Sequence, residues 1–457
     1  MDLDIVILAA GKGTRMRSAT AKVLHELAGR PMIEHVLEAA RELSPRHLCL
    51  VVGHQADEVR GTVQDEVIWV EQANQQGTGH AVRLALEALP DDGATLVLYA
   101  DVPLVSRATL DAAVAAARAG NLGLVTADFD DPAELGRIVR AEDGRIERIV
   151  EFKDASPDER DISEINSGIL AAPTDRLAGW LARVQPNNAQ GEYYLTDIIE
   201  MAVADGLVVE GVIAQDVAEV TGVNDRIQLA QLERIYQLRE SRRLMRDGVT
   251  MADPARVDIR GKVNAGSDCF VDANVLLAGE VTLGSGVHIG TGCVISDAVL
   301  GDNVEVKPHT IIEGAQIADG CALGPFARIR PGTVLDTGVL IGNFVETKKA
   351  HLGEGSKASH LAYLGDARIG KGCNIGAGTI TCNYDGVDKH LTEIGDDVFV
   401  GTNSTLVAPI TIDSGAFVAA GTTVTVKVGG EELAVGRARQ RNIAGWVRPE
   451  QRKSKGE

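Results

Sequence analysis

The second half of the chain carries an apolar residue at every sixth position. One set starts at Val257, and a second set lies two positions after some of its members. The two sets are Val257, Val263, Cys269, Val275, Val281, Val287, Cys293 and Val299, and Ile259, Val271, Leu277, Leu283, Ile289 and Ile295. A period of six matches neither the 3.6-residue period of an α-helix nor the alternation of a single strand. It is typical of hexapeptide repeats, which fold as a β-helix of stacked coils.

After Val299 the apolar phase shifts by one residue and then resumes. The later repeats begin at Leu323, Ile341, Ile369, Ile375, Ile394 and Ile412. The repeat is interrupted after Thr379, and residues 382–390 show no six-residue phase. We expect this segment to be a loop that leaves the coil, and such loops often carry function.

The first half of the chain has a different pattern, in which apolar strands alternate with helical segments. The expected strands are 4–10, 47–52 and 95–99, and the expected helices are 32–43 and 79–89. This alternation predicts an open α/β sheet with helices on both faces. Ligands bind at the carboxyl ends of the strands in such sheets, so residues that follow these strands are the first candidates for a site.

A connector joins the two halves. Asp225 followed by Gln228 resembles a capping box, and the apolar residues that follow predict a long helix over 227–247. The domains expected from this pattern are 1–226, the linker helix 227–247 and the β-helix 248–457. The last residues, 454–457, are expected to be disordered.

Composition and charge narrow the function classes. The 457 residues carry a net charge of −20 without a long basic stripe, which argues against a nucleic-acid partner. Neither a signal peptide nor a long apolar span is visible, so we expect a cytoplasmic protein without membrane insertion. The six cysteines form no CxxC pair, and Cys269 and Cys293 fall on the apolar phase as small core residues.

Two strand ends in the first half carry candidate chemistry. The first strand runs into Gly11-Lys-Gly-Thr-Arg15, whose backbone N–H groups and cations Lys12 and Arg15 suit a polyphosphate. The loop is neither a Walker A motif nor the dinucleotide fingerprint. Asp101 follows the strand 95–99, where it either binds magnesium next to phosphates or caps a turn.

These motifs are part of an ordered series. The series contains Leu8-Ala-Ala-Gly11-Lys-Gly-Thr-Arg15-Met, Lys22-Val-Leu, Gln72, Gly77-Thr78-Gly-His80, Tyr99-Ala-Asp101-Val-Pro, Gly136-Arg-Ile, Glu151, Asn166-Ser-Gly168, Gly191-Glu-Tyr-Tyr-Leu-Thr-Asp197 and Gly222-Val-Asn224. It resembles the sugar-phosphate nucleotidyltransferase family. With the hexapeptide half attached, it resembles the bifunctional bacterial members, which join an N-acetylglucosamine-1-phosphate uridylyltransferase to a glucosamine-1-phosphate N-acetyltransferase. That resemblance implies a Rossmann-like first domain and a left-handed β-helix.

The resemblance also implies roles for residues of the first half. The uracil and ribose of UTP would be held by Leu8, Ala9, Ala10, Gly11, Gln72, Gly77 and Thr78. Lys22 and Arg15 would contact phosphates. The pocket for N-acetylglucosamine-1-phosphate would be lined by Tyr99, Ala100, Asp101, Gly136, Glu151 and Asn166. The cofactor Mg2+ would be ligated by Asp101 and Asn224.

Several polar side chains stand out in the otherwise neutral coil. Hexapeptide spacing makes Lys348, His360 and Tyr363 neighbours along the stack, and Arg330 follows an apolar position of the repeat. A histidine titrates near neutral pH and can serve as general base for an acceptor amine. His360 matches the base position of the family that the chain resembles, with His351 and His390 as rivals. The late cations Lys427, Arg437, Arg439 and Arg441 suit the phosphates of coenzyme A.

By the same resemblance, the second half would hold the acetyl-transfer substrates. Glucosamine-1-phosphate would be bound by Arg330, Lys348, Tyr363 and Asn374, and acetyl-CoA by Ala377, Asn383, Tyr384, Thr402, Ala420 and Arg437. Relatives have Ser where this chain has Thr402, which keeps the hydroxyl. The resemblance implies a homotrimer with acetyl sites shared between subunits. The alternatives are a single-function nucleotidyltransferase with a structural β-helix and a sugar-nucleotide sensor without enzymatic activity.

Overall fold

The computed structural model describes residues 1–64 and 66–453. The expectation for residues 454–457 therefore lies outside the described residues. The chain divides into two compact units, Met1–Arg239 and Glu240–Glu457. This division falls inside a helix, and we describe each unit by itself.

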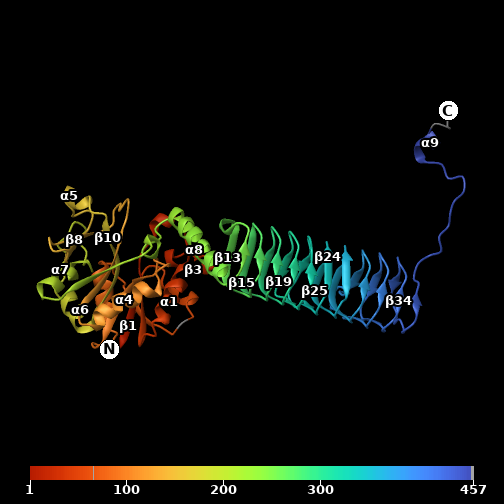
Figure 1. Ribbon diagram of the computed structural model, residues 1–457, viewed down its shortest axis with the longest axis horizontal. Coiled ribbons are helices and arrows are strands. Elements are labelled where there is room, and N and C mark those ends of the chain that lie inside the picture. The colour runs from red at the N-terminus through yellow and green to blue at the C-terminus, as the bar shows by residue number, and fades with distance from the viewer. Residues whose placement is uncertain (65, 454–457) are drawn as a thin grey trace. The chain divides into compact units, whose positions relative to one another are not determined.

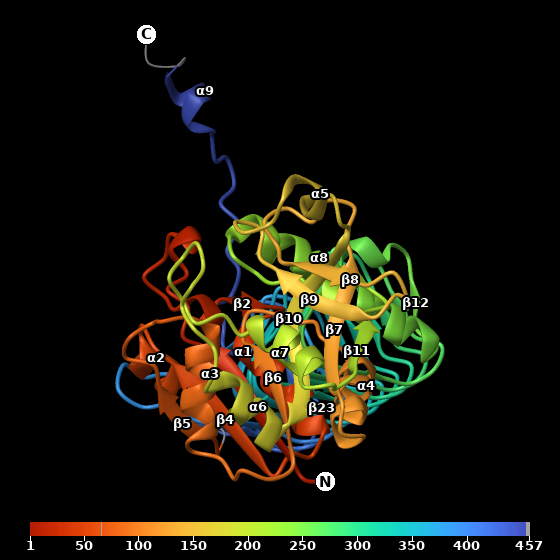
Figure 2. The ribbon, with the colours of Figure 1, turned by 90° about the vertical axis from the view of Figure 1, so that its left-hand side faces the viewer.

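The first unit is built on a mixed sheet with the strand order β11-β7-β10-β6-β1-β4-β5 (Figure 2). These strands are β1 (Leu3–Ala9), β4 (His47–Val52), β5 (Ile68–Glu71), β6 (Ala94–Tyr99), β7 (Leu122–Asp128), β10 (Glu164–Pro173) and β11 (Val209–Ile213). β10 runs antiparallel to β6 and β7, while β1 pairs in parallel with β4 and β6. A hairpin of β8 (Arg137–Arg140) and β9 (Ile146–Val150) joins the sheet through β10.

Helices cover both faces of this sheet, as the alternation of segments predicted. Along β1, Ile5 and Ile7 enter one core cluster, whereas Val6 and Leu8 enter another. Because successive strand residues point to opposite faces, one uniformly apolar strand can fill two cores. The first core takes residues from α1 (Met32–Glu42), α2 (Ala56–Thr62) and α4 (Arg107–Arg118), and the second takes residues from α3 (Thr78–Leu86), α6 (Thr174–Leu181) and α7 (Asp197–Ala204).

The connector is the helix α8 (Arg226–Arg246). Asp225 caps it, since its Oδ1 accepts hydrogen bonds from the backbone N–H groups of Ile227 and Gln228, each at 2.9 Å. The reciprocal half of the expected capping box differs, because Gln228 Oε1 accepts from the N–H of Asn224 at 2.7 Å and not from that of Asp225. The helix start therefore fixes the backbone of Asn224, a predicted site residue.

The second unit stacks short strands in parallel ladders, which confirms the predicted β-helix (Figure 1). One ladder contains β12 (Thr250–Met251), β14 (Phe270–Val271), β16 (His288–Ile289), β18 (Glu305–Val306), β21 (Ala322–Leu323), β24 (Leu340–Asn343), β26 (Lys357–His360), β28 (Asn374–Ile375), β31 (Phe399–Val400), β34 (Phe417–Val418) and β36 (Leu433–Ala434). Strands in register recur about every 17 or 18 residues, so each coil places its apolar residue above that of the previous coil.

A branched ladder provides the other walls of the coil. Its main path contains β13 (Val257–Ala265), β15 (Val275–Leu283), β17 (Val294–Leu300), β19 (Ile311–Glu313), β22 (Arg328–Ile329), β25 (Glu346–Leu352), β27 (Tyr363–Ile369), β29 (Ile380–Cys382), β32 (Thr405–Val407) and β35 (Thr423–Val424). Its branches are β20 (Gln316–Ile317), β23 (Val334–Leu335), β30 (Thr392–Ile394) and β33 (Ile410–Ile412).

The shift of the repeat comes earlier than the sequence pattern placed it. Ala278 pairs with Ser296, but Val281 pairs with Ala298, so the coil loses one residue between these pairs. Ala298 is buried in the core, whereas Val299 is 51% exposed. The prediction that Val299 is a core residue is therefore wrong, because strand register and not residue type decides which side chain points inward. Cys269 and Cys293 are buried in this core, as predicted.

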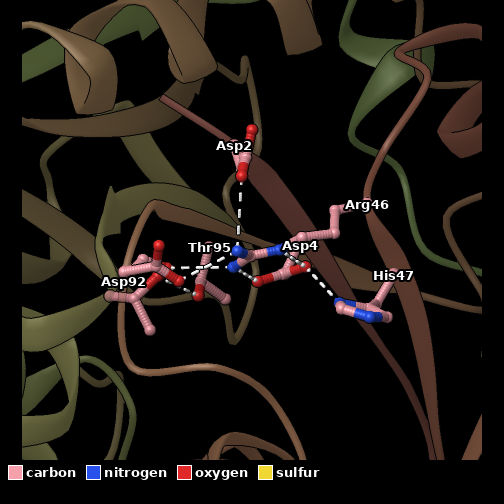
Figure 3. A network of polar contacts seen from close by, with 7 residues as sticks. Asp2, Asp4, Arg46, His47, Asp92 and Thr95 are labelled. Atoms are coloured by element: carbon pink, nitrogen blue, oxygen red, sulfur yellow. Dashed lines mark hydrogen bonds and ion pairs between the residues drawn. The ribbon is translucent and has the colours of Figure 1, made fainter.

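A buried carboxylate ties together the amino ends of three strands of the first unit. The Asp4 side chain on β1 is fully buried, and its Oδ2 accepts from Arg46 Nη2 at 2.6 Å. Its Oδ1 lies 2.9 Å from His47 Nδ1, and Arg46 also contacts Asp2 and Asp92. Figure 3 shows the Arg46 guanidinium between these three aspartates. Hydrogen bonds to Asp4 and Asp92 raise the pKa of Arg46.

In the part of the chain that the structure describes, no helix combines the length and the apolar character needed to cross a membrane.

Replacing Asp4 with Asn should destabilise the first unit. The change keeps the shape but removes the charge-assisted hydrogen bond between Asp4 and Arg46, which typically contributes about 2 kcal/mol of unfolding free energy. The control is Asp92→Asn, since the Asp92 side chain is 70% exposed and should matter by no more than about 0.5 kcal/mol. Urea unfolding followed by tryptophan fluorescence measures both. Equal effects of the two changes would contradict this account.

Candidate functional sites

A pocket opens where β1 and β6 end, at the sheet edge where ligands were expected. It is lined by Leu8, Ala9, Ala10, Gly11, Lys22, Val23, Gln72, Gln75, Gly77, Thr78, Ala81, Tyr99, Asp101 and Glu192. Most of the residues predicted to hold a nucleotide thus line one pocket. The buried Gln72 side chain donates to the carbonyl oxygen of Gly77 at 3.0 Å, which fixes one wall.

The segment 191–197 closes the wall that contains Gly77. Gly77 has φ +112°, and a Cβ there would lie 2.5 Å from the Tyr193 carbonyl oxygen. The N–H of Gly79 donates to the same oxygen at 2.9 Å, and the N–H of Leu195 donates to Thr78 Oγ1 at 3.2 Å. Only glycine allows the two segments to approach this closely, so the two separate sequence motifs form one structural element.

A second group of predicted residues gathers beside Tyr99. The N–H of Asn166 donates to the Gly136 carbonyl oxygen at 2.9 Å, and Gly136 packs against the Glu151 carboxylate. Gly168, at φ +83°, faces the Tyr99 ring, where a Cβ would lie 2.6 Å from Cε2. Burial raises the pKa values of Tyr99 and Glu151. The arrangement offers hydroxyl, carboxylate and amide groups to a polar ligand such as a sugar.

Two predicted metal ligands converge on one position. The Asp101 carboxylate and the Asn224 amide oxygen both accept from Lys22 Nζ, the latter at 3.2 Å. The N–H of Val223 donates to the Asp101 carbonyl oxygen at 2.9 Å, which brings the loop before α8 against the end of β6. Mg2+ bound with phosphates needs only one or two protein oxygens, so this donor pair fits it. No cluster of three or more acidic, histidine or cysteine ligands occurs among residues 1–64 and 66–453.

Arg15 lies apart from this pocket lining. It is exposed and lines a neighbouring hollow with Thr14, Arg17 and Arg226 at the start of α8. The exposed guanidinium is free to face a polyphosphate, but the structure does not place it among the residues that surround Asp101.

The predicted site residues omit four residues of the pocket, Val23, Gln75, Ala81 and Glu192, of which Gln75 and Glu192 are polar. Gln75 donates to the carbonyl oxygen of Ala10, and Glu192 lines the same pocket. Gln75 lies between the motif residues Gln72 and Gly77, and Glu192 lies inside the Gly191–Asp197 motif. Their positions within the two motifs were the only available signal.

In the second unit, Asp366 organises a cationic cluster. Its Oδ2 accepts from Lys348 Nζ at 3.2 Å and from Asn383 Nδ2. Strand register places Lys348 beside Gly365 and Tyr363 beside Glu346, and Arg330 Nη1 donates to Glu346 Oε1 at 2.7 Å. Arg330, Lys348 and Tyr363, which were predicted to bind an anionic sugar, therefore lie on neighbouring coils.

His360 begins a row that continues through the predicted acetyl-CoA residues. Its register partner is Asn343, and the N–H of Gly378 donates to the Leu361 carbonyl oxygen at 2.9 Å, which places Ala377 on the next coil. The N–H groups of Asn403 and Gly421 make the same bonds to the carbonyl oxygens of Ala377 and Thr402. Successive coils therefore stack Ala377, Thr402 and Ala420 above His360, and Arg437 Nη1 donates to the Ala420 carbonyl oxygen.

The three candidate base histidines have different partners. His351 lies 3.0 Å from both carboxylate oxygens of Asp336, and His390 Nε2 lies 2.7 Å from Asp385 Oδ2. The Nδ1 atom of His360 lies 2.6 Å from the neutral amide oxygen of Asn343. With Nδ1–H donating to that oxygen, Nε2 keeps its lone pair available to accept a proton. This geometry favours His360.

Asn374 lies on the outward side of its ladder, paired in register with Lys357 and Phe399.

A residue that sequence reasoning missed is Lys389, in the loop after β29. A side-chain hydrogen bond with Lys348, together with the charge of that lysine, lowers the pKa of Lys389. Lys389 lies in the loop singled out for its lost repeat, but its distance from Lys348 in the sequence hides their contact.

Comparison with known proteins gives results for both units. A model described as MobA-like NTP transferase domain matches residues 5–166, a GMPPB C-terminal domain model matches 259–345, and a model for the hexapeptide repeat of succinyl-transferase matches 392–426. Curated relatives are named bifunctional protein GlmU. The protein from Pseudomonas putida is 56% identical over 98% of this chain and 99% of its own length. The protein from Alkalilimnicola ehrlichii is 53% identical over 100% of this chain and 98% of its own length. The protein from Marinobacter nauticus is 52% identical over 98% of this chain and 99% of its own length.

The buried carboxyl groups beside the first pocket predict a pH dependence of stability. Burial and the nearby carboxylates, Glu151 first, raise the pKa of Asp197 to about 6. A raised pKa favours the folded state when the group is protonated, so this contribution is present below about pH 4 and is lost as the pH rises through 6. Asp197→Asn places a side chain there that does not ionise, so it should remove the loss of folding stability between about pH 4 and 6.

The measurement is the free energy of unfolding at pH 4.5, 5.5 and 6.5 for both proteins, read from tryptophan fluorescence in urea. The wild-type value should fall relative to the variant value across this interval. A difference between the two proteins that does not change with pH would contradict the assignment.

Proposed function

The chain belongs to the bifunctional GlmU family, and from this premise we propose which residues carry each of its reactions. It is an enzyme with two activities, a uridylyltransferase and an acetyltransferase. We assign uridylyl transfer to the pocket at the ends of β1 and β6, and acetyl transfer to the coils around His360. The row from His360 through Ala377, Thr402 and Ala420 is the observation that carries the second assignment.

In the first reaction, UTP and N-acetylglucosamine-1-phosphate give UDP-N-acetylglucosamine and pyrophosphate. The sugar phosphate is already ionised, so its oxygen attacks the α-phosphorus without a general base. The strand-end residues Leu8 to Gly11 and Gln72 hold the nucleotide, while Glu151 and Asn166 orient the sugar, which supplies proximity and alignment. Lys22 and Arg15 neutralise phosphate charge. Mg2+, when bound by Asp101 and Asn224, would stabilise the charge on the leaving pyrophosphate.

In the second reaction, the amine of glucosamine-1-phosphate attacks the thioester of acetyl-CoA. His360 Nε2 accepts the proton that the amine loses as the C–N bond forms. The C–S bond breaks, and coenzyme A leaves as the thiolate, which takes that proton from His360 to become the thiol. Arg330 and Lys348 bind the phosphate, and Tyr363 and Asn374 contact the sugar. The stacked row Ala377, Thr402, Ala420 and Arg437 tracks the extended coenzyme.

We also propose a cytoplasmic homotrimer, and a row of exposed apolar residues supports the assembly. Phe326, Phe344 and Leu361 occupy the same corner of successive coils, each at positive φ, and they are 49%, 55% and 60% exposed. The rings of Phe326 and Phe344 stack at 5.6 Å. An exposed apolar row costs solubility, so burial by a second copy is the interpretation that accounts for it.

Two substitutions separate the two sites. His360→Ala should lower acetyl transfer by at least about 100-fold and leave uridylyl transfer unchanged, because it removes only the proton acceptor. Asp101→Ala should lower uridylyl transfer by a similar factor and spare acetyl transfer. Coenzyme A thiol release and pyrophosphate release measure the two rates. Loss of both activities in a folded single-site variant would reject the assignment of separate sites.

The assembly is tested by Phe344→Asp, which places a charge in the exposed row. The variant should sediment as a smaller species than the wild-type trimer in analytical ultracentrifugation. Phe417→Asp is the control, since Phe417 is also exposed and stacks on Phe399 at 4.5 Å on a different row. A trimer that survives Phe344→Asp, or a wild-type monomer, would overturn the proposal.

A further inference from the structure

The loop after β29 is a small hairpin with its own hydrogen bonds. Tyr384 and Lys389 form an antiparallel bridge, and the N–H of His390 donates to the Asn383 carbonyl oxygen at 2.8 Å. The N–H of Asp385 donates to the Asp388 carbonyl oxygen at 3.2 Å. Residues 383–390 are therefore held as a hairpin although they have left the coil.

One side chain occupies the centre of this hairpin. Asp385 Oδ1 accepts from the N–H groups of Val387 and Asp388 at 2.8 and 2.7 Å, and its Oδ2 lies 2.7 Å from His390 Nε2. The His390 interaction and these two N–H groups hold the pKa of Asp385 well below its usual range. The carboxylate thus stays ionised and links the tip of the hairpin to its base.

The base of the hairpin meets the cationic cluster of the coil. Asn383 is buried and donates to Asp366, which also accepts from Lys348. Lys389 is held in the bridge with Tyr384, and its interaction with Lys348 lowers the pKa of Lys389. Because a cationic neighbour disfavours a second cation nearby, the hydrogen bonds of the hairpin must fix where Lys389 lies.

We propose that Asp385 and His390 are positioning residues for acetyl transfer, a clasp that holds Lys389 and Asn383 against Lys348 and Asp366. The proposal rests on the proposed function of this site. In this proposal His390 accepts no proton from the substrate, whereas the sequence analysis kept His390 as an alternative general base. Val387 at the tip is 84% exposed, and only its backbone N–H, which donates to Asp385, takes part in the clasp.

The clasp predicts a specific kinetic pattern. His390→Ala should raise KM for glucosamine-1-phosphate about 10-fold with a smaller change in kcat, because substrate positioning and not proton transfer is lost. His390→Gln should recover most of the affinity, since its amide N–H can donate to Asp385 in the manner of the imidazole. The pH profile of kcat should keep its form in both variants. A wild-type KM in His390→Ala, or a lost limb of the pH profile, would overturn the proposal.

Coupling and hydrogen exchange test the clasp without relying on catalysis. His390→Ala should speed amide exchange at Val387 and Asp388, and adding it to Asp385→Ala should produce little further change, since both remove the same link. The matched control is His351→Ala, which breaks a histidine–aspartate pair with Asp336 outside the loop and should leave exchange at 387–388 unaltered. Additive effects of the two clasp substitutions would contradict the proposal.

The experiments distinguish failure of the proposed function from failure of the clasp. If His360→Ala keeps acetyl transfer, the proposed function of the site is wrong, whatever the exchange data show. If His360→Ala abolishes acetyl transfer but His390→Ala leaves both exchange and KM unchanged, the site stands and the clasp is rejected.

Discussion

Parallel strand register is the constraint on which both units depend. In the first unit, parallel pairing of β1 with β6 brings Gly11 and Asp101 to the same edge of the sheet, although they are far apart in sequence. In the second unit, the same pairing repeats coil after coil and turns a spacing of 17 to 25 residues into direct stacking, as for His360, Ala377 and Thr402. The residues that stand on these coils are thus aligned by strand register alone.

The functional residues of both sites lie where strand pairing ends or is interrupted. The first pocket uses strand ends and the loop before α8, where Gln228 fixes the backbone of Asn224. The second site uses the corner after His360 and the hairpin 383–390, which leaves the coil and returns through Thr392 in register with Ala367. Because the coil on either side keeps its pairing, an insertion can carry polar residues without disturbing the apolar core.

The sequence predicted the architecture because both periodicities are local. Strand and helix ends in the first half agree to within three residues for β6, α1 and α3. The sequence pattern placed Val299 in the core, and this prediction was wrong. The coil is one residue shorter at this point, and only the pairing of Val281 with Ala298 shows that Val299 points outward. The sequence pattern also missed the Asp4–Arg46 network and the contact of Lys389 with Lys348, since both join residues from different segments whose approach only the fold determines.

An acidic chain that binds anionic substrates must prevent its own carboxylates from repelling them. In this protein, three of the cations assigned to a phosphate have acidic or amide partners: Lys22 has Asp101 and Asn224, Arg330 has Glu346, and Lys348 has Asp366. Such pairs hold long side chains in one orientation, so less conformational freedom remains to be lost when substrate binds. They also cancel local negative charge, which lets a net charge of −20 coexist with two phosphate-binding sites. The carboxylates are thus part of the binding sites, because they orient the cations that meet the substrate.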